Sequence, residues 1–235
     1  MSTQVDLGTV FKGSSSGKIV QAKGETVELK PDQVVIDIAY SGLCGSDLHF
    51  RKKGDMVLGH EGVGIISQVG KDVDFLKVGD RVGWGCNHNA CNYCKQCWNG
   101  VDTLCPHRAF YSMADPQFGS FGDRAVLSGY FVHKIPDDLP LKYAGPLQCG
   151  GATVYGAIVK AGARPIDRVG VVGLGGLGHL AVQYLNKMGC EVVVFSHSSS
   201  KKEQATKLGA HEFVAVKENP EMKGVKPINH LLVST

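Results

Sequence analysis

The sequence lacks the long apolar run that a membrane-spanning segment requires. No window of its 235 residues approaches the roughly 18 consecutive apolar residues of a spanning helix. Its first residues, MSTQVDLGTVFKG, do not have the basic and then apolar order of a secretory signal. An excess of one charge is also missing, since 25 Lys and Arg are interspersed with 22 Asp and Glu. We therefore expect a cytoplasmic protein that binds neither membrane nor nucleic acid.

Two residue types are plentiful instead. Glycine accounts for 31 of the 235 residues, nearly twice the usual share of about 7%. There are also eight cysteines, and spaced cysteines in a cytosolic protein more often bind metal or perform chemistry than form disulfides. Apolar residues make up 43% and charged residues 20%, a globular balance that excludes wholesale disorder.

The first 150 residues have the pattern of short strands separated by glycine-rich turns. Strands are predicted at Val34–Tyr40, Gly62–Val69 and Arg81–Trp84, where β-branched and aromatic residues are bounded by Gly, Ser and Asp. This spacing is typical of a partly open barrel or a small sandwich.

Beyond a boundary near Leu147–Val154, strands and helices alternate. Helices are predicted at Ala152–Ala161, Leu177–Met188 and Lys201–Leu208, and strands at Val169–Val172, Glu191–Phe195, Phe213–Val216 and His230–Val233. Apolar strands alternating with helices predict a parallel, doubly wound sheet. A complete dinucleotide fold of this type has six strands, so we expect this one to be incomplete.

Four cysteines lie close together in a polar segment. Cys91, Cys94, Cys97 and Cys105 have the spacing C-x2-C-x2-C-x7-C, and four thiolates can surround one tetrahedral zinc ion at about 2.3 Å. Such a site is closed to substrate and therefore structural. The alternatives are incidental thiols and an iron–sulfur cluster, but the x7 gap and the lack of a second cluster favour zinc.

A second set of ligand-type residues is scattered along the chain. Cys44 lies in CGSDLH, His60 and Glu61 lie in GHEG, and Cys149 lies in PLQCGG. Two thiolates and one imidazole can hold zinc with an open fourth position, the arrangement of a catalytic site. From spacing alone the alternative is open, because a cysteine beside glycine is commonly a core residue.

Three polar residues beside Cys44 fit this second site. Asp47 could hold the far nitrogen of His60, as carboxylates commonly do behind a metal-bound imidazole. Ser46 could pass a proton from a bound alcohol toward His49. The alternative for Ser46 is a turn or cap hydroxyl.

A glycine-rich turn follows the first strand of the alternating region. In VGVVGLGGLG, Gly173, Gly175 and Gly178 form G-x-G-x-x-G between a predicted strand and a predicted helix. The first glycine permits a tight turn, the second admits a pyrophosphate, and the third allows close helix packing. An unliganded turn is the alternative, but the flanking elements favour dinucleotide binding.

The end of the next strand bears on the choice of nucleotide. NAD-binding proteins place Asp or Glu there, whereas the segment from Ser196 to Lys202 has no acid before Glu203. Hydroxyl and ammonium groups suit a 2′-phosphate, so NADP is favoured. The alternative is a solvated loop in which Ser199 or Ser200 caps the next helix.

Taken together, these motifs resemble the zinc-dependent medium-chain alcohol dehydrogenases, and most of all their cinnamyl-alcohol-dehydrogenase-like NADP branch. The resemblance covers essentially the whole chain and rests on CGSDLH, GHEG, the four-cysteine segment, PLQCGGATVYGA, GLGGLGH and FSHSSSKK. It implies a GroES-like, partly open β-barrel catalytic domain over residues 1–150. It also implies a partial Rossmann domain over residues 151–235.

The resemblance implies roles for individual residues. The expected catalytic-zinc ligands are Cys44, His60 and Cys149, with Glu61 as an alternate or supporting ligand, and the expected structural-zinc ligands are Cys91, Cys94, Cys97 and Cys105. Ser46 and His49 are the implied proton relay. The expected contacts with NADP are Thr153, Gly173, Gly175, Gly176, Leu177, Gly178, Ser196, His197 and Lys201. His197 stands where arginine is common in the family, which weakens the expected preference for NADP. Cys86 and Phe110 are expected to line the substrate pocket.

The resemblance also implies an activity, with two departures from the family pattern. The expected reaction interconverts primary alcohols and aldehydes by hydride transfer with NADP(H), using two zinc ions per chain. Only fifteen residues separate Cys44 from His60, fewer than is usual, and family members continue well beyond the last residue here.

The homodimer usual in the family is therefore in doubt, and a non-catalytic zinc-binding fragment is the alternative function. A nucleic-acid-binding zinc module is disfavoured because no basic stripe accompanies the cysteines.

Overall fold

The computed structural model describes residues 3–113 and 116–234. The chain divides into two compact units, Met1–Cys149 and Gly150–Thr235. Within the described residues, no helix is long and apolar enough to cross a membrane.

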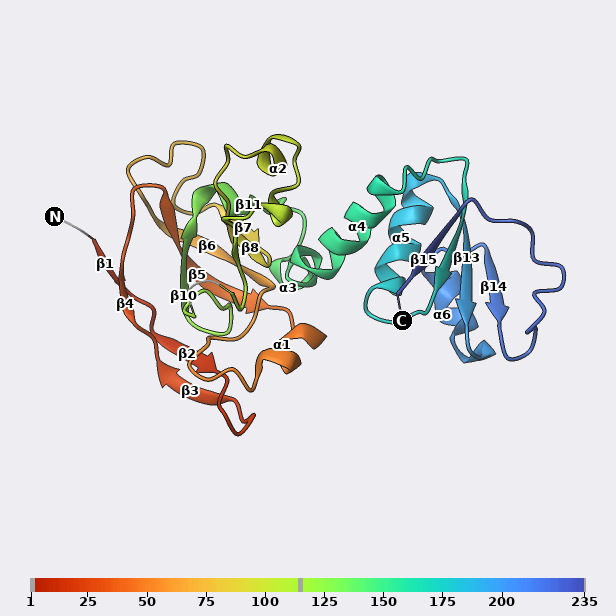
Figure 1. The fold of residues 1–235 in the computed structure, drawn as a ribbon, viewed down its shortest axis with the longest axis horizontal. Coiled ribbons are helices and arrows are strands. Elements are labelled where there is room, and N and C mark those ends of the chain that lie inside the picture. The colour runs from red at the N-terminus through yellow and green to blue at the C-terminus, as the bar shows by residue number, and fades with distance from the viewer. Residues whose placement is uncertain (1–2, 114–115, 235) are drawn as a thin grey trace. The chain divides into compact units, whose positions relative to one another are not determined.

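The first unit is made mainly of short strands (Figure 1). Its strands are β1 (Gln4–Asp6), β2 (Thr9–Lys12), β3 (Val20–Lys23), β4 (Thr26–Glu28), β5 (Gln33–Ser41), β6 (Gly62–Val69), β7 (Arg81–Trp84), β8 (Asn87–Asn89), β9 (Ala109–Phe110), β10 (Arg124–Ser128) and β11 (His133–Lys134). Its helical segments are α1 (Gly45–Phe50), α2 (Lys95–Trp98), η1 (Asp102–Leu104), η2 (Gly129–Phe131), α3 (Leu141–Ala144) and η3 (Pro146–Gln148).

The main sheet of this unit is antiparallel and runs in the order β10-β5-β6-β7-β11. Both faces of β5 are covered along its first half. Val34 and Ile36 pack in one apolar cluster, whereas Val35, which points the other way, packs with Val5 and Val126 in another. This explains why the first half of β5 contains three consecutive apolar residues rather than an alternating pattern.

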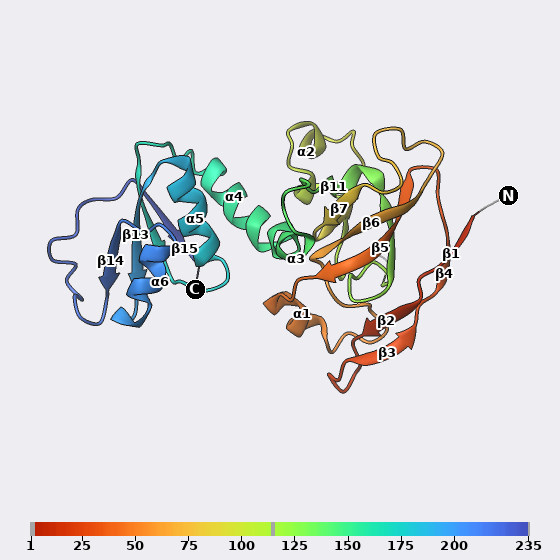
Figure 2. The ribbon, with the colours of Figure 1, turned by 180° about the vertical axis from the view of Figure 1, so that it is seen from behind.

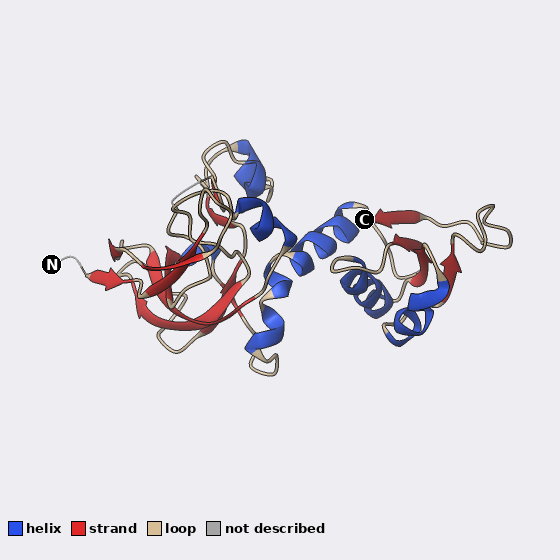
Figure 3. Ribbon diagram, turned by 90° about the horizontal axis from the view of Figure 1, so that it is seen from below, coloured by secondary structure: helices blue, strands red, loops and turns tan. Residues whose placement is uncertain are grey.

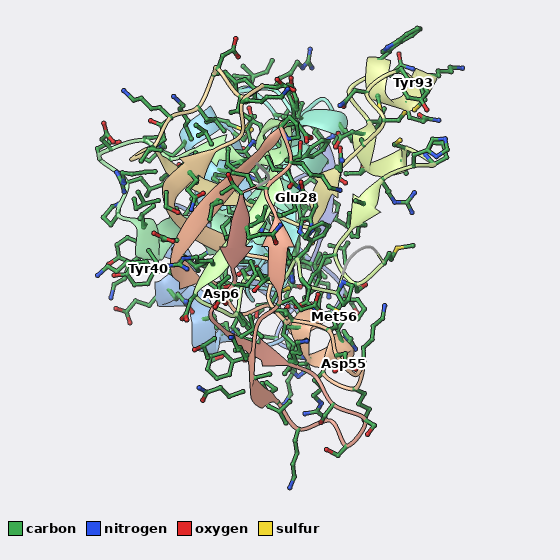
Figure 4. The ribbon with its side chains drawn as sticks, turned by 90° about the vertical axis from the view of Figure 1, so that its left-hand side faces the viewer. Asp6, Glu28, Tyr40, Asp55, Met56 and Tyr93 are labelled. Atoms are coloured by element: carbon green, nitrogen blue, oxygen red, sulfur yellow. The ribbon has the colours of Figure 1, made fainter. Side chains whose placement is uncertain are left out.

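Smaller elements surround the main sheet. The hairpin of β2 and β3 is drawn in red in Figures 1 and 2 and joins the rest of the unit through bridges at Val10 and Lys12. The segment between β8 and β9 forms a lobe, residues 90–108, that contains α2, η1 and the four clustered cysteines. Neither α2 nor η1 has a buried apolar residue among its members, and Tyr93 is exposed on the lobe (Figure 4). The lobe therefore has almost no apolar core of its own.

The second unit is a parallel sheet with helices. Its elements are α4 (Gly150–Lys160), β12 (Arg168–Val172), α5 (Gly178–Met188), β13 (Glu191–Ser196), η4 (Ser199–Lys201), α6 (Lys202–Lys207), β14 (Glu212–Ala215) and β15 (His230–Val233). The strand order is β14-β13-β12-β15, with every pair parallel. Helix α5 packs on β12 and β13, and α6 packs on β14. Figure 3 shows the helices of the protein in blue and its strands in red.

An ionic cluster around a buried arginine joins the amino ends of three of these strands. The guanidinium of Arg168, at the start of β12, contacts the carboxylates of Glu191 on β13 and Glu212 on β14. Arg168 is 6% exposed, and its backbone N–H donates to the side chain of Asn229. Next to it, buried Asp167 accepts from the backbone N–H of Arg164 at 2.7 Å and lies 3.3 Å from the ring of His230.

The mixed architecture predicted from sequence is confirmed, with antiparallel sheets in the first unit and a parallel sheet in the second. The ends of β6, β7 and β15 match their predicted ranges. Helix α6 differs from prediction, because its first turn is the separate 3₁₀ turn η4. Ser198, not Ser199 or Ser200, precedes that turn, and it makes no side-chain cap.

Candidate metal and nucleotide sites

The scattered ligand-type residues of the first unit converge. One donor atom from each of Cys44, His60, Glu61 and Cys149 lies within 4.8 Å of all the others. Cys44 precedes α1, His60 and Glu61 precede β6, and Cys149 follows η3. Segments as far apart as residues 44 and 149 therefore supply one cluster.

His60 is oriented by two contacts. Its ring is fully buried, with Nδ1 2.8 Å from Oδ1 of Asp47 and Nε2 3.3 Å from Sγ of Cys149. Because a carboxylate is only an acceptor, Nδ1–H donates to Asp47, and the lone pair of a neutral ring is then on Nε2. The contact predicted between Asp47 and His60 is confirmed, and the nitrogen facing Cys149 is the one free to bind a cation.

Asp47 is the centre of a buried hydrogen-bond network. Its Oδ2 accepts from the backbone N–H of Cys44 at 2.9 Å, and its Oδ1 also accepts from the hydroxyl of Tyr111 at 3.0 Å. Burial by itself would raise the pKa of Asp47, but the hydrogen bonds from His60, Cys44 and Tyr111 outweigh burial and lower it. Asp47 is therefore a carboxylate that can support a cationic or metal-bound imidazole.

The pKa is raised at three of these residues, His60, Glu61 and Cys149. Burial disfavours the charged form of His60, yet the contacts with Asp47 and Cys149 raise its pKa to about 10. The neighbouring thiol of Cys86, with burial, raises the pKa of Cys149 against the opposing effect of His60, and burial raises the pKa of Glu61. A cation in this cluster would replace these protons, since metal binding and proton release are linked.

The four clustered cysteines also converge. Within the lobe, Sγ–Sγ distances are 4.0 Å for Cys91 and Cys97, 3.6 Å for Cys94 and Cys97, and 3.5 Å for Cys105 and Cys91. All four thiols lie within 4.8 Å of one another, and none is in a disulfide. Burial raises the pKa of Cys97 to about 12, whereas a backbone hydrogen bond from Cys97 lowers that of Cys94.

Both clusters fit zinc. Tetrahedral bonds of about 2.3 Å to sulfur place two ligand sulfurs about 3.8 Å apart, in the middle of the 3.5–4.0 Å observed in the lobe. A bond of about 2.0 Å to nitrogen gives an N–S separation of about 3.5 Å, close to the 3.3 Å between His60 and Cys149. The lobe offers four sulfurs, whereas the other cluster offers two sulfurs, a nitrogen and a carboxylate.

The glycine-rich turn of the second unit has the geometry of a phosphate loop. It connects β12 to α5, and Gly173 has a φ of 86°. A Cβ on Gly178 would lie 1.9 Å from the carbonyl oxygen of Gly173, whereas one on Gly175 or Gly176 would meet nothing within 4 Å. Leu177 precedes α5 without a side-chain cap, so no side chain covers the amino end of the helix beside this open surface, as phosphate binding requires.

The residues expected near a 2′-phosphate lie at the carboxyl end of β13. Ser196 ends that strand, His197 follows it and is exposed, and the ammonium of Lys201 donates to the carbonyl of Leu174 in the glycine loop at 2.9 Å. The structure also brings in a carboxylate that sequence reasoning missed. Glu218 accepts from the backbone N–H of Ser199 at 3.3 Å. The loop that the sequence presented as free of acid therefore has one beside it.

Other expected site residues are placed as follows. Ser46 and His49 lie on α1, next to the ligand-type cluster, and no hydrogen bond joins them in the described part of the chain. Thr153 is exposed on α4. Cys86 packs with Met56, Leu58 and Tyr111, and Phe110 is half-buried on β9.

Tyr111 and Glu218 had no signal in the sequence. Tyr111 is 64 residues from Asp47, and Glu218 is 19 residues from Ser199. Neither belongs to a motif, so only the fold reveals these contacts.

Comparison with known proteins assigns both units. Residues 30–137 match the alcohol dehydrogenase GroES-like domain, and residues 176–227 match the zinc-binding dehydrogenase domain. A cinnamyl alcohol dehydrogenase from Sorghum bicolor superposes with a TM-score of 0.85 at 30% identity, over 100% of this chain and 70% of that one. The chain belongs to the zinc-dependent medium-chain alcohol dehydrogenase family.

Other relatives of this chain in the alcohol dehydrogenase family are named as enzymes that act on aldehydes or alcohols. The probable formaldehyde dehydrogenase AdhA of Bacillus subtilis is 39% identical over 216 residues, which are 87% of this chain and 62% of that protein. The protein CAD of Helicobacter pylori, solved as a complex with NADP(H), has a TM-score of 0.82 at 30% identity, over 100% of this chain and 70% of that one. The chain thus spans 62% of the length of its Bacillus relative. The GroES-like and Rossmann architecture inferred from the sequence motifs is confirmed.

Proposed function

We propose that this chain carries the zinc site and the nucleotide-phosphate site of an oxidoreductase that interconverts primary alcohols and aldehydes with NADP(H). The observation that carries the proposal is the convergence of Cys44, His60 and Cys149 in a cluster with the spacing of zinc ligands. Three such donors leave one position for a substrate oxygen. Relatives named as aldehyde reductase and cinnamyl alcohol dehydrogenase support the substrate class.

In this proposal Cys44, His60 and Cys149 hold a catalytic zinc, with Glu61 as an alternate or supporting donor. The four cysteines of the lobe hold a second, structural zinc, and its coordination by four thiolates excludes substrate. When bound, the catalytic zinc supplies a Lewis acid for the oxygen of the substrate. Asp47 keeps the His60 ring in the tautomer that presents Nε2.

The remaining roles belong to protein groups near these sites. Ser46 and His49, one turn apart on α1, would move a proton between the substrate oxygen and solvent. The open surface at Gly175 and Gly176 and the uncapped amino end of α5 would bind the pyrophosphate. Thr153 is proposed to contact the nicotinamide.

We assign the preference for NADP(H) to the end of β13. Ser196, His197 and Lys201 would bind a 2′-phosphate, and the ammonium of Lys201 already lies against the glycine loop. Glu218 opposes this preference, because its carboxylate would repel the phosphate. The complex of the Helicobacter relative with NADP(H) supports the assignment. The many thiols favour a reducing compartment, which we propose is the cytoplasm.

The test uses the full chain and the variant Cys44→Ala. The wild type should bind two zinc ions, show a higher melting temperature with NADPH, and oxidise NADPH in the presence of aldehydes. Cys44→Ala should lose one zinc and all turnover, because it removes a ligand. The control is Cys190→Ala, which changes a buried thiol of the second unit outside both clusters and should retain both properties. Undiminished turnover in Cys44→Ala would contradict the proposal.

We propose a second candidate function, zinc binding without catalysis. Four thiols of the lobe and the donors of the Cys44–His60–Cys149 cluster converge within this chain by themselves, and the chain spans 62% of the length of its Bacillus relative. Two zinc ions with a nucleotide-dependent rise in melting temperature, but no turnover with any aldehyde, would favour this second function.

A further inference from the structure

Tyr111 makes three contacts with residues in and beside the ligand-type cluster, although no sequence motif includes it. Its hydroxyl donates to Oδ1 of Asp47 at 3.0 Å and accepts from the backbone N–H of Gly59 at 2.8 Å. Its ring lies against the ring of His60, with centroids 4.7 Å apart. Tyr111 is 4% exposed, so these contacts are protected from competing water.

These contacts reach both ends of the segment that connects Cys44 to His60. At one end, the Asp47 carboxylate that accepts from Tyr111 also accepts from the backbone N–H of Cys44 at 2.9 Å. At the other end, the N–H of Gly59 is bonded to the tyrosine oxygen, one residue before His60. A single side chain is therefore bonded both to the carboxylate that contacts Cys44 and His60 and to the backbone of the residue before His60.

The position of Tyr111 is itself fixed by surrounding residues. Its backbone N–H donates to the carbonyl of Cys86 at 2.8 Å. Its ring meets that of Phe50 edge-on, with centroids 5.4 Å apart, and packs with Met56 and Leu58. Phe50, Met56 and Leu58 belong to the segment between Cys44 and His60, whereas Cys86 lies outside it, so the backbone bond to Cys86 anchors Tyr111 independently of that segment.

We propose that Tyr111 is a positioning residue that holds Cys44 and His60 at their zinc-binding separation by bonding Asp47 and the Gly59 backbone. The inference rests on the proposed zinc site. It gives a physical account of how a segment with only fifteen residues between its two ligands can present both toward one ion. Part of the restraint comes from outside the segment, through a residue of the neighbouring β9 strand region.

The hydroxyl has a role that the aromatic ring alone cannot fill. As a donor it satisfies Oδ1 of Asp47 beside the His60 N–H, and as an acceptor it satisfies the buried Gly59 N–H. Tyr111→Phe retains the ring and its packing but leaves that N–H without its partner and Asp47 with one donor fewer. Loss of such supporting hydrogen bonds typically lowers metal affinity about 10- to 100-fold.

The test measures zinc affinity of the full chain by competition with a chromogenic chelator, resolved into its two sites. Tyr111→Phe should lower affinity at the Cys44–His60–Cys149 site at least tenfold and leave the four-cysteine site unchanged, which is an internal reference within each molecule. With Co²⁺ in place of zinc, the visible absorption bands of the altered site should shift, because they report ligand geometry. Tyr184→Phe, which removes a hydroxyl from a half-buried tyrosine of the second unit, is the matched control and should change neither site.

A double-mutant cycle separates positioning from general packing. If Tyr111 acts through Asp47, then Tyr111→Phe should cost much less zinc affinity in the Asp47→Asn background than in the wild type. Equal losses in both backgrounds, or affinity within twofold of wild type in Tyr111→Phe, would overturn the inference while leaving the proposed function in place. A wild-type chain that binds zinc only in the lobe would contradict the proposed function and this inference together.

Discussion

The carbonyl oxygen of Gly173 occupies the space where a side chain on Gly178 would begin. A Cβ on Gly178 would lie 1.9 Å from that oxygen, whereas a Cβ on Gly175 would meet no atom within 4 Å. The two glycines of one motif are thus required for different reasons. Gly178 is needed for the fold itself, and Gly175 leaves space for a ligand.

This difference predicts opposite results for two variants. Gly178→Ala should destabilise the chain by about 3 kcal/mol, at the upper end of overpacking costs, because the backbone must shift. Gly175→Ala should retain wild-type unfolding but bind NADPH at least tenfold more weakly, since its methyl group would point into the phosphate site. Urea unfolding and nucleotide fluorescence titration measure the two effects. Equal stability of both variants would contradict this account.

Metal removal should unfold the lobe selectively. Because residues 90–108 have almost no apolar core, zinc is expected to supply most of their folding free energy, as in other small structural zinc sites. Chelation, or the variant Cys97→Ser, should make Lys95 and Arg108 rapidly cleavable by trypsin while the rest of the chain resists. Cys190→Ala is the control. Resistance of the lobe in metal-free protein would show that zinc is not its main support.

Asp167 should make the second unit sensitive to acid. Hydrogen bonding from the backbone N–H of Arg164, with His230 and the Arg164 side chain nearby, lowers the pKa of Asp167 in the folded chain. A lowered pKa gives stability that is fully present above the unfolded value of about 3.9 and is lost as pH falls through the folded pKa. The stability gap between wild type and Asp167→Asn should therefore be largest near pH 7 and close below about pH 4. Urea midpoints across this range measure it, with exposed Asp137→Asn as the control that should show no gap.

Glu218 should weaken the preference for NADPH. Its exposed carboxylate accepts from the N–H of Ser199, beside the proposed 2′-phosphate site. A like charge about 4 Å away in water costs about 1 kcal/mol, or about fivefold in affinity. Glu218→Gln should raise the ratio of NADPH to NADH affinity by about that factor, measured by fluorescence titration. Glu221→Gln, which changes an acid paired with Lys223, should leave the ratio unchanged, and no change in either variant would remove Glu218 from nucleotide selection.

The sequence predicted the elements that are long or sharply bounded. Strand β6 begins at Gly62 and ends before Gly70, and helix α5 ends before Gly189, so glycine marks their ends. It did not predict β3 or β8, because these strands have only four and three residues and β3 is mostly exposed. Their pairing depends on tertiary neighbours rather than on a local pattern.

In the candidate site, too, some contacts could be predicted from the sequence and others could not. The pairing of Asp47 with His60 followed from the chemistry of metal-bound imidazole, which needs a partner at its other nitrogen. Tyr111 could not be found in this way, since a buried tyrosine has many ordinary reasons to be present. The carboxylate of Glu218 was missed because the loop after β14 returns to the loop after β13, a contact that no pattern within either loop encodes.

The guanidinium of Arg168 and the glycine loop lie at opposite ends of β12. The charge cluster ties together the starts of three neighbouring strands, while the open turn at Gly175 follows the other end. Substitutions at the starts of these strands can therefore tune how firmly the sheet is anchored without altering the surface offered to a nucleotide. The stability of the sheet and the binding of a nucleotide are therefore separable properties of this unit, and evolution or an engineer can adjust one while leaving the other intact.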